Sequence, residues 1–224
     1  MILKQIYLYP DLIEFSACPE DRLAAQDQTR HICNYLERNL SSLKFEANGF
    51  NKICFVGYSR PAIEMHINSS NALCVPIAFD MKSWRQMPRE KMSDFFADML
   101  RAGLQKCADN YEIPLENMLQ WLSNLCEKNY RNEWDFREKS FRQEGIKCRL
   151  KCSLTLDAFA LRLLVLRKEV VVFDKVILET VPDEVAYHYR FKDIVVERGK
   201  LVVTSKLHGE DKRVLYEAEL SDFE

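Results

Sequence analysis

Hydrophobic residues recur at two different spacings along the chain, and the change comes near residue 140. Before it, apolar residues return every three or four positions over 92–107 and 115–126, which is typical of two amphipathic helices. After it, they alternate with polar residues from Ile146 to Leu156, which is typical of a strand with one buried face. The pattern predicts a pair of helices followed by β-structure.

The first third of the chain mixes both spacings. Residues 2–9 are rich in β-branched and aromatic types and predict a strand. A helix is expected over 19–44, because Pro19 suits a first helical position and acidic residues follow it. Short apolar runs separated by turn residues then predict a small antiparallel meander over 52–58, 62–67 and 73–79.

Closely spaced breaks divide the last third into short strand-like runs. Such spacing favours hairpins, and hence an antiparallel sheet. The runs lie at 158–166, 169–180, 185–196, 200–207 and 213–220. The predicted fold class is α+β, with a mixed strand and helix portion that carries the helix pair, and a C-terminal, mostly antiparallel β-sheet.

The domain organisation follows from the same change of spacing. We expect a mixed α/β portion over 1–129 and an antiparallel β portion over 140–224. The charged segment 129–144 could be a linker between them, although it holds no proline and its nearest glycine, Gly145, directly follows it. The two portions could equally form one continuous domain.

Composition narrows the class of protein. The 224 residues carry 32 basic and 34 acidic side chains, a net charge of -2, without a basic or acidic tail. The N-terminus lacks the apolar run of a secretory leader, and the longest apolar run is far too short to span a bilayer. We therefore expect a soluble, cytoplasmic protein without membrane contact, whose eight cysteines are free thiols and mostly buried.

Signatures of catalysis are weak throughout. The run from Gly57 to Pro61 imitates a hydrolase nucleophile elbow, but it ends in proline and no long helix is expected behind it. Glu210-Asp211-Lys212 has the letters of a nuclease motif, yet it follows Gly209 in a polar turn. The chain has neither a phosphate-binding glycine loop nor clustered metal ligands. The sequence predicts no catalytic residue, no metal and no cofactor.

Two surface features remain as candidates for binding a partner. Residues 130–151 hold seven basic and four acidic groups with interleaved aromatics, a pattern that suits an acidic partner or a nucleic-acid backbone. The opposing interpretation is a solvated sheet face with counter-charges opposite the cations. The second feature is an alternating aromatic and polar run over 186–191, which is equally at home in a hairpin. The candidate partner-binding residues are Arg131, Trp134, Arg137, Arg142, Lys147, Arg149, Tyr187, His188, Tyr189 and Arg190.

These observations favour a non-catalytic protein that binds another protein. One concrete form is an inhibitor or immunity-type protein that neutralises a toxin or effector by covering it, since such a protein needs a complementary surface and no motif. Two alternatives stay open. The first is a hydrolase or nuclease whose site is assembled from scattered Asp, Glu, His or Cys, and the second is a nucleic-acid-binding protein that uses residues 130–151. The sequence sets no oligomeric state.

Overall fold

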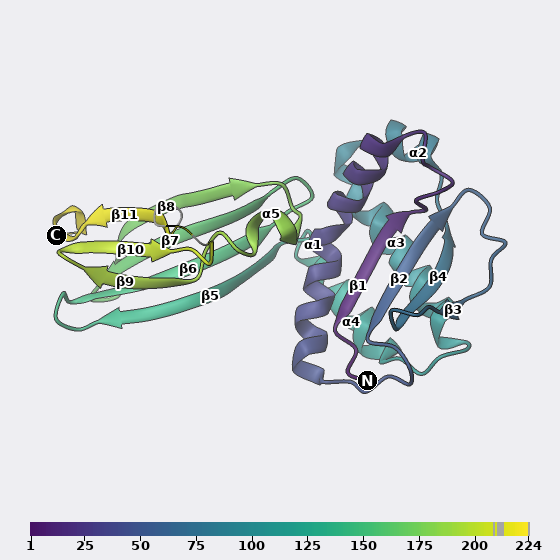
Figure 1. Ribbon diagram of the computed structural model, residues 1–224, viewed down its shortest axis with the longest axis horizontal. Helices are drawn as coiled ribbons and strands as arrows, with labels where there is room; N and C mark the ends of the chain where they lie inside the picture. The colour runs from purple at the N-terminus through teal and green to yellow at the C-terminus, as the bar shows by residue number, and fades with distance from the viewer. Residues whose placement is uncertain (208, 210–212, 224) are drawn as a thin grey trace. The chain divides into compact units, whose positions relative to one another are not determined.

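The computed structural model describes residues 1–207, 209 and 213–223 (Figure 1). The Glu210-Asp211-Lys212 motif lies outside these residues. The fold is α+β, as the sequence predicts. The chain divides into two compact units, Met1–Asn132 and Glu133–Glu224. Within the described part of the chain, no helix is both long enough and apolar enough to cross a membrane.

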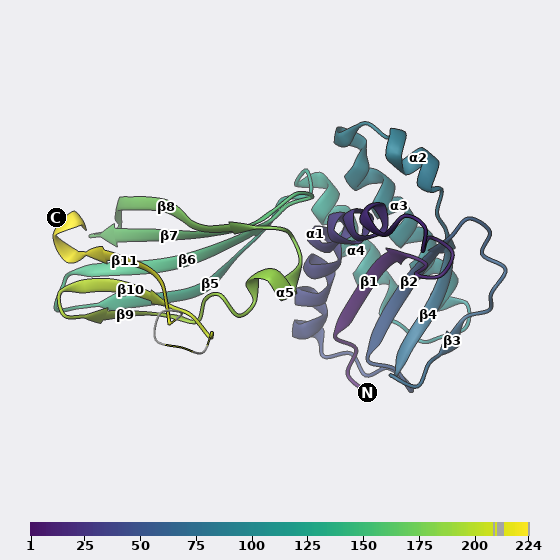
Figure 2. The ribbon, with the colours of Figure 1, turned by 45° about the horizontal axis from the view of Figure 1, so that its top comes forward.

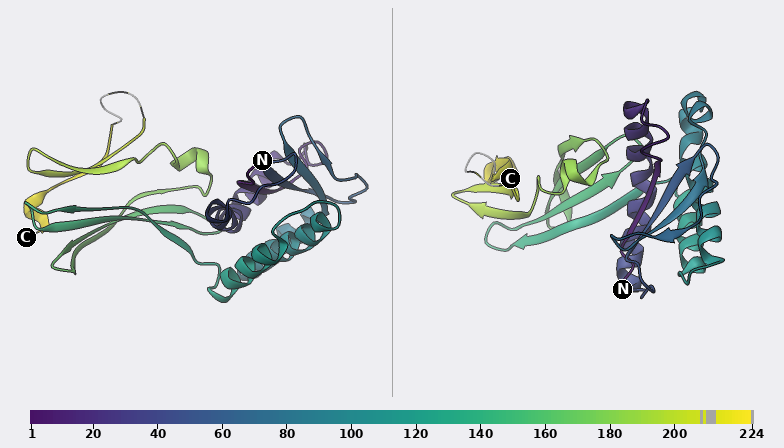
Figure 3. Two further views of the ribbon diagram at one scale, coloured as in Figure 1. Left: turned by 90° about the horizontal axis from the view of Figure 1, so that it is seen from below. Right: turned by 45° about the vertical axis from the view of Figure 1, so that its right-hand side comes forward.

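Unit 1 is a sheet with helices packed on one face (Figures 1 and 3). The strands lie in the order β1-β2-β4-β3. Inward side chains such as Ile53, Phe55 and Leu73 are fully buried beneath the helices. The elements are β1 (Gln5–Pro10), α1 (Pro19–Leu43), β2 (Lys52–Tyr58), β3 (His66–Ile67), β4 (Ala72–Ala78), α2 (Met81–Gln86), α3 (Arg89–Ala108) and α4 (Leu115–Glu127).

The expected antiparallel meander over 52–79 is wrong. Strands β1, β2 and β4 are mutually parallel, and only the two-residue β3 runs antiparallel to β4. Near-continuous burial of β2 and β4 is typical of parallel strands inside an α/β layer. The turn residues at 59–61 and 68–71 belong to the return connection that makes this parallel pairing possible.

Helix α1 also completes the outer edge of β1. The backbone N–H of Ile6 donates to Glu37 Oε1 over 2.8 Å, and Arg30 donates to the carbonyl of Ile6 over 2.9 Å. Arg30 and Glu37 are themselves an ion pair at 2.9 Å, with side chains 5% and 15% exposed. This pair supplies hydrogen-bond partners that a further strand would otherwise provide.

Unit 2 consists of two antiparallel sheets that face each other (Figures 2 and 3). One sheet has the order β5-β6-β7-β8 and the other β11-β10-β9. Alternating residues of β6 and β7, among them Leu150 and Leu163, are fully buried between the sheets. The elements are β5 (Asn132–Phe141), β6 (Ile146–Leu154), β7 (Phe159–Arg167), β8 (Val170–Thr180), α5 (Glu184–Tyr187), β9 (Asp193–Glu197), β10 (Lys200–Thr204), β11 (Val214–Glu219) and the 3-10 helix η2 (Leu220–Phe223).

Two local expectations for the second half are corrected. The charged segment 129–144 contains the ten-residue strand β5 rather than a linker. The expected strand over 185–196 starts only at Asp193, because Asp183 caps the short helix α5 by accepting a hydrogen bond from the N–H of Val185. All eight cysteines are free, and five of them are buried.

The Arg30–Glu37 pair yields a prediction for stability. Arg30→Met should lower the free energy of unfolding by about 3 kcal/mol, because it removes the cation beside a buried carboxylate and one hydrogen-bond donor to a strand carbonyl. Urea denaturation measures the change, with the exposed Lys91→Met as the matched control. Equal stability of the two variants would show that the pair does not support the edge of β1.

Buried His31 makes unit 1 sensitive to acid. Burial lowers the pKa of His31 from 6.5 to about 4, so the folded protein holds the neutral ring while the unfolded chain takes up a proton. This stabilisation is complete above pH 6.5 and is lost as the pH falls toward 4. For this group alone, linkage gives a loss of about 2 kcal/mol between pH 7 and pH 5.

Urea denaturation at these two pH values tests the assignment. His31→Asn should show a smaller drop in stability on acidification than the wild type. The exposed His66→Asn should keep the wild-type drop. The same drop in all three proteins would contradict the role of His31.

Candidate functional site

The cations of β6 lie on the outward face of their strand and are paired. Lys151 contacts Glu133 at 2.6 Å, Arg149 contacts Glu138 at 2.7 Å, and Lys147 contacts Glu138 at 3.1 Å. The hydrogen bonds from Arg149 and then Lys147 hold the pKa of Glu138 below its usual value. Neighbouring strand β5 therefore carries the counter-charges for this row.

The cations of β5 are also engaged. Lys139 reaches Asp193 at 2.7 Å, and Arg137 lies 3.5 Å from the same carboxylate. Partial burial would raise the pKa of Asp193, but the bond from Lys139 keeps it below its usual value. A partner that used Arg137, Lys147 or Arg149 would first have to displace carboxylates of the protein itself.

The other candidates from residues 130–151 are scattered. Arg131 is exposed before β5, and Arg142 is exposed in the turn after it. Trp134 is half-buried against the core of unit 2, with its ring 6.3 Å from that of Phe159.

The run 186–191 is divided between core and surface. Tyr187 is 4% exposed, and its ring stacks on Phe159 at 3.7 Å between centroids. Phe191 is also buried and lies parallel to Phe159 at 5.7 Å. Since both ends of the run are held in the core, the residues between them, 188–190, are turned outward and exposed.

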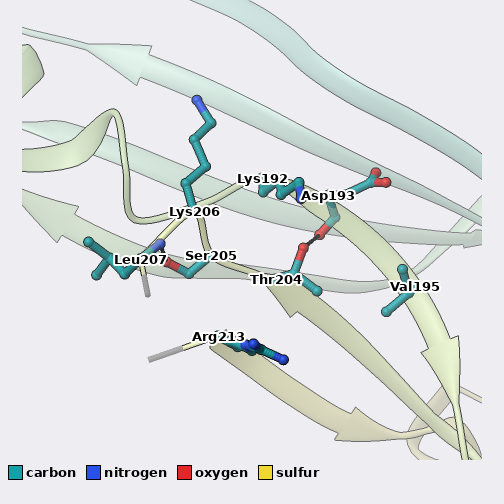
Figure 4. Close-up of a pocket in the computed structure, with 8 residues that line it drawn as sticks. All are labelled: Lys192, Asp193, Val195, Thr204, Ser205, Lys206, Leu207 and Arg213. Atoms are coloured by element: carbon teal, nitrogen blue, oxygen red, sulfur yellow. Dashed lines mark hydrogen bonds between the residues drawn. The ribbon is translucent and has the colours of Figure 1, made fainter. Parts of the chain in front are cut away.

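These exposed residues adjoin a recess at the end of the second sheet. The carbonyl of Tyr189 accepts hydrogen bonds from Ser205 Oγ and from the backbone N–H of Lys206, each at 3.0 Å. Lys206 Nζ lies 3.3 Å from the Nε2 atom of His188. The recess measures about 450 Å³ and is lined by Lys192, Asp193, Val195, Thr204, Ser205, Lys206, Leu207 and Arg213 (Figure 4).

A second recess of about 250 Å³ shares Ser205 and Leu207 with the first and is also lined by Arg190 and Val214. Tyr189, Leu207 and Val214 are 55%, 39% and 44% exposed. We call the two recesses and their rim the cationic surface. Its basic members are His188, Arg190, Lys192, Lys206 and Arg213, and it also includes the carboxylate of Asp193.

The one carboxylate among the described residues that line the first recess is that of Asp193, and it is paired with Lys139 and Arg137 of β5. Among residues 1–207, 209 and 213–223, no side chain forms an ion pair with Arg190, Lys192 or Arg213. Figure 4 shows the side chains of Lys206 and Arg213 pointing in different directions. The charge is therefore spread along a rim and does not converge on one point, as an enclosed anion site would require.

One contact in unit 1 resembles part of a hydrolase site. His31 Nε2 lies 3.0 Å from Ser93 Oγ, and its Nδ1 lies 2.8 Å from the carbonyl of Gln28, which imitates a Ser–His pair. The ring is 1% exposed, and burial lowers its pKa to about 4, so it is a poor general base at neutral pH. Within the described part of the chain, no three His, Cys, Asp or Glu residues are placed to hold a metal ion.

Sequence reasoning found His188, Tyr189 and Arg190 but missed Lys192, Lys206 and Arg213. The sequence did contain a signal for Lys206 and Arg213, because a hairpin over 200–220 brings the ends of its two strands together. The backbone N–H of Ser205 indeed donates to the carbonyl of Arg213 over 2.7 Å. The contact of this hairpin with residues 188–192 depends on the tertiary fold and has no sequence signal.

Comparison with known proteins identifies no family. Neither the protein-family models, nor the curated proteins, nor the solved structures give a match to this chain.

Proposed function

We propose that this chain is a non-catalytic, cytoplasmic protein that binds an acidic surface of another protein. The observation that carries the proposal is the contrast between two sets of cations. Those of β5 and β6 are neutralised within the chain, whereas Arg190, Lys192 and Arg213 have no carboxylate partner among the described residues. Cations that form no ion pair within the described part of the chain are the ones that an external carboxylate can pair with at least cost.

The apolar part of the cationic surface supports a protein partner in particular. Exposed Tyr189, Leu207 and Val214 lie among the charges, and Tyr and Arg are enriched where interfaces carry most of their energy. A nucleic-acid backbone would instead favour an extended row of available cations, and the row on β6 is paired with Glu133 and Glu138.

The specific form that we propose is an inhibitor that neutralises a toxin or effector by covering an acidic surface on it. Such an inhibitor needs charge and shape complementarity and no reactive group. The spread of charge around two shallow recesses suits a macromolecular surface better than a small substrate.

Charge reversal tests the proposal. Immobilised wild-type protein should capture an acidic protein from native extract, and added salt should weaken the capture. Arg190→Glu combined with Arg213→Glu should reduce affinity about thirtyfold or more, since truncating one hot-spot residue already costs about 2 kcal/mol.

The matched control is Lys147→Glu combined with Arg149→Glu, which changes the net charge by the same four units in the paired row on β6. This control should retain the partner. Loss of the partner in the control and not in the reversal variant would overturn the assignment of the surface. Capture that disappears on nuclease treatment would overturn the protein partner in favour of nucleic acid.

A further inference from the structure

Two cysteines of unit 1 lie directly opposite each other on neighbouring strands. In the parallel ladder of β2 and β4, Cys54 is the register partner of Cys74. Neighbouring strands are about 4.8 Å apart, and disulfides form between Cα atoms about 4.4–6.8 Å apart. The backbone therefore places the two residues within bridging distance.

Both thiols also point to the same side. Their strand neighbours Ile53, Phe55, Leu73 and Val75 are fully buried against the helices, so the alternation of a strand directs Cys54 and Cys74 to the opposite face of the sheet. Figures 1 and 3 show that the helices of unit 1 leave this face of β2 and β4 uncovered.

The two sulfurs differ in their surroundings. Cys54 is 7% exposed, and the Tyr9 hydroxyl acts to lower its pKa. Cys74 is only half-buried, and Asn68 Nδ2 donates to its sulfur over 3.7 Å. Burial raises the pKa of both thiols, while Tyr9 at Cys54 and Asn68 at Cys74 act in the opposite direction and favour the thiolates. Cys74 is the sulfur that a reagent in solution reaches more easily.

We propose that Cys54 and Cys74 are a redox pair that forms a reversible cross-strand disulfide in the presence of a peroxide. Hydrogen peroxide oxidises the Cys74 thiolate to a sulfenic acid and releases water. The Cys54 thiolate then attacks the Cys74 sulfur, which expels the sulfenic oxygen as a second water and leaves the disulfide. Two thiol protons and two electrons pass to the peroxide, and a dithiol reverses the bond by thiol–disulfide exchange.

Four other cysteines of the chain do not meet these conditions. Cys148 and Cys152 share the buried face of β6, but four residues along one strand separate them by about 13 Å. Cys33 and Cys107 are fully buried in unit 1. Cys148 and Cys152 therefore form an internal control that no local bond can join.

The test treats the native full-length protein with hydrogen peroxide, blocks the remaining thiols by alkylation and analyses chymotryptic peptides by mass spectrometry. We expect one linked species that joins the peptides of Cys54 and Cys74, lighter by two hydrogen atoms and separated again by dithiothreitol. Its yield should not depend on protein concentration, because the bond is intramolecular.

Two variants complete the experiment. Cys54→Ser should abolish the linked species and leave Cys74 as a sulfenic acid that a dimedone probe labels. Cys148→Ser should leave the linked species unchanged. Oxidation that leaves Cys54 and Cys74 both open to alkylation, or that links Cys74 to a different cysteine in the folded wild type, would overturn the proposal.

Discussion

Stacking of Tyr187 and Phe191 on Phe159 is the contact on which the candidate site of unit 2 depends. The two outer rings enter the core from either end of a short connection, and the three residues between them have to face outward. The exposed connection then presents the carbonyl of Tyr189 to Ser205 and Lys206, which ties it to the end of β10. An aromatic contact in the core thus positions charges that lie far apart in the sequence.

Ion pairing distinguishes the cations that are neutralised within the protein from those that a partner can contact. In the hairpin of β5 and β6, basic side chains of β6 face acidic side chains of β5. These side chains form ion pairs with one another at the surface. Such exposed pairs contribute little to stability, but they remove the local field that an acidic partner would sense. The basic segment 130–151 is consequently not the surface that offers available charge to a partner.

The β-structure of unit 2 could be predicted well, because a strand with one buried face has apolar and polar residues at alternate positions. The unbroken alternation of β6 from Ile146 to Leu154 is the clearest case. The strand pairing of unit 1 was harder to predict. Its parallel strands β2 and β4 are buried almost continuously, so their sequences show no alternation that would distinguish parallel from antiparallel pairing. At 185–191, aromatic residues at alternate positions resemble a strand, but Asp183 caps a helix there and the rings stack in the core.

The sequence by itself determined the α+β class, the main amphipathic helices and the alternating strands, because burial of one face imposes a local period on the residues that form it. It also determined that both candidate surfaces carry charge and aromatic side chains. Only the tertiary structure decided which cations meet a carboxylate, that His31 meets Ser93, and that Cys54 faces Cys74. Electrostatic and hydrogen-bond partners are chosen by distance in space, and strand order and packing set that distance without leaving a local pattern.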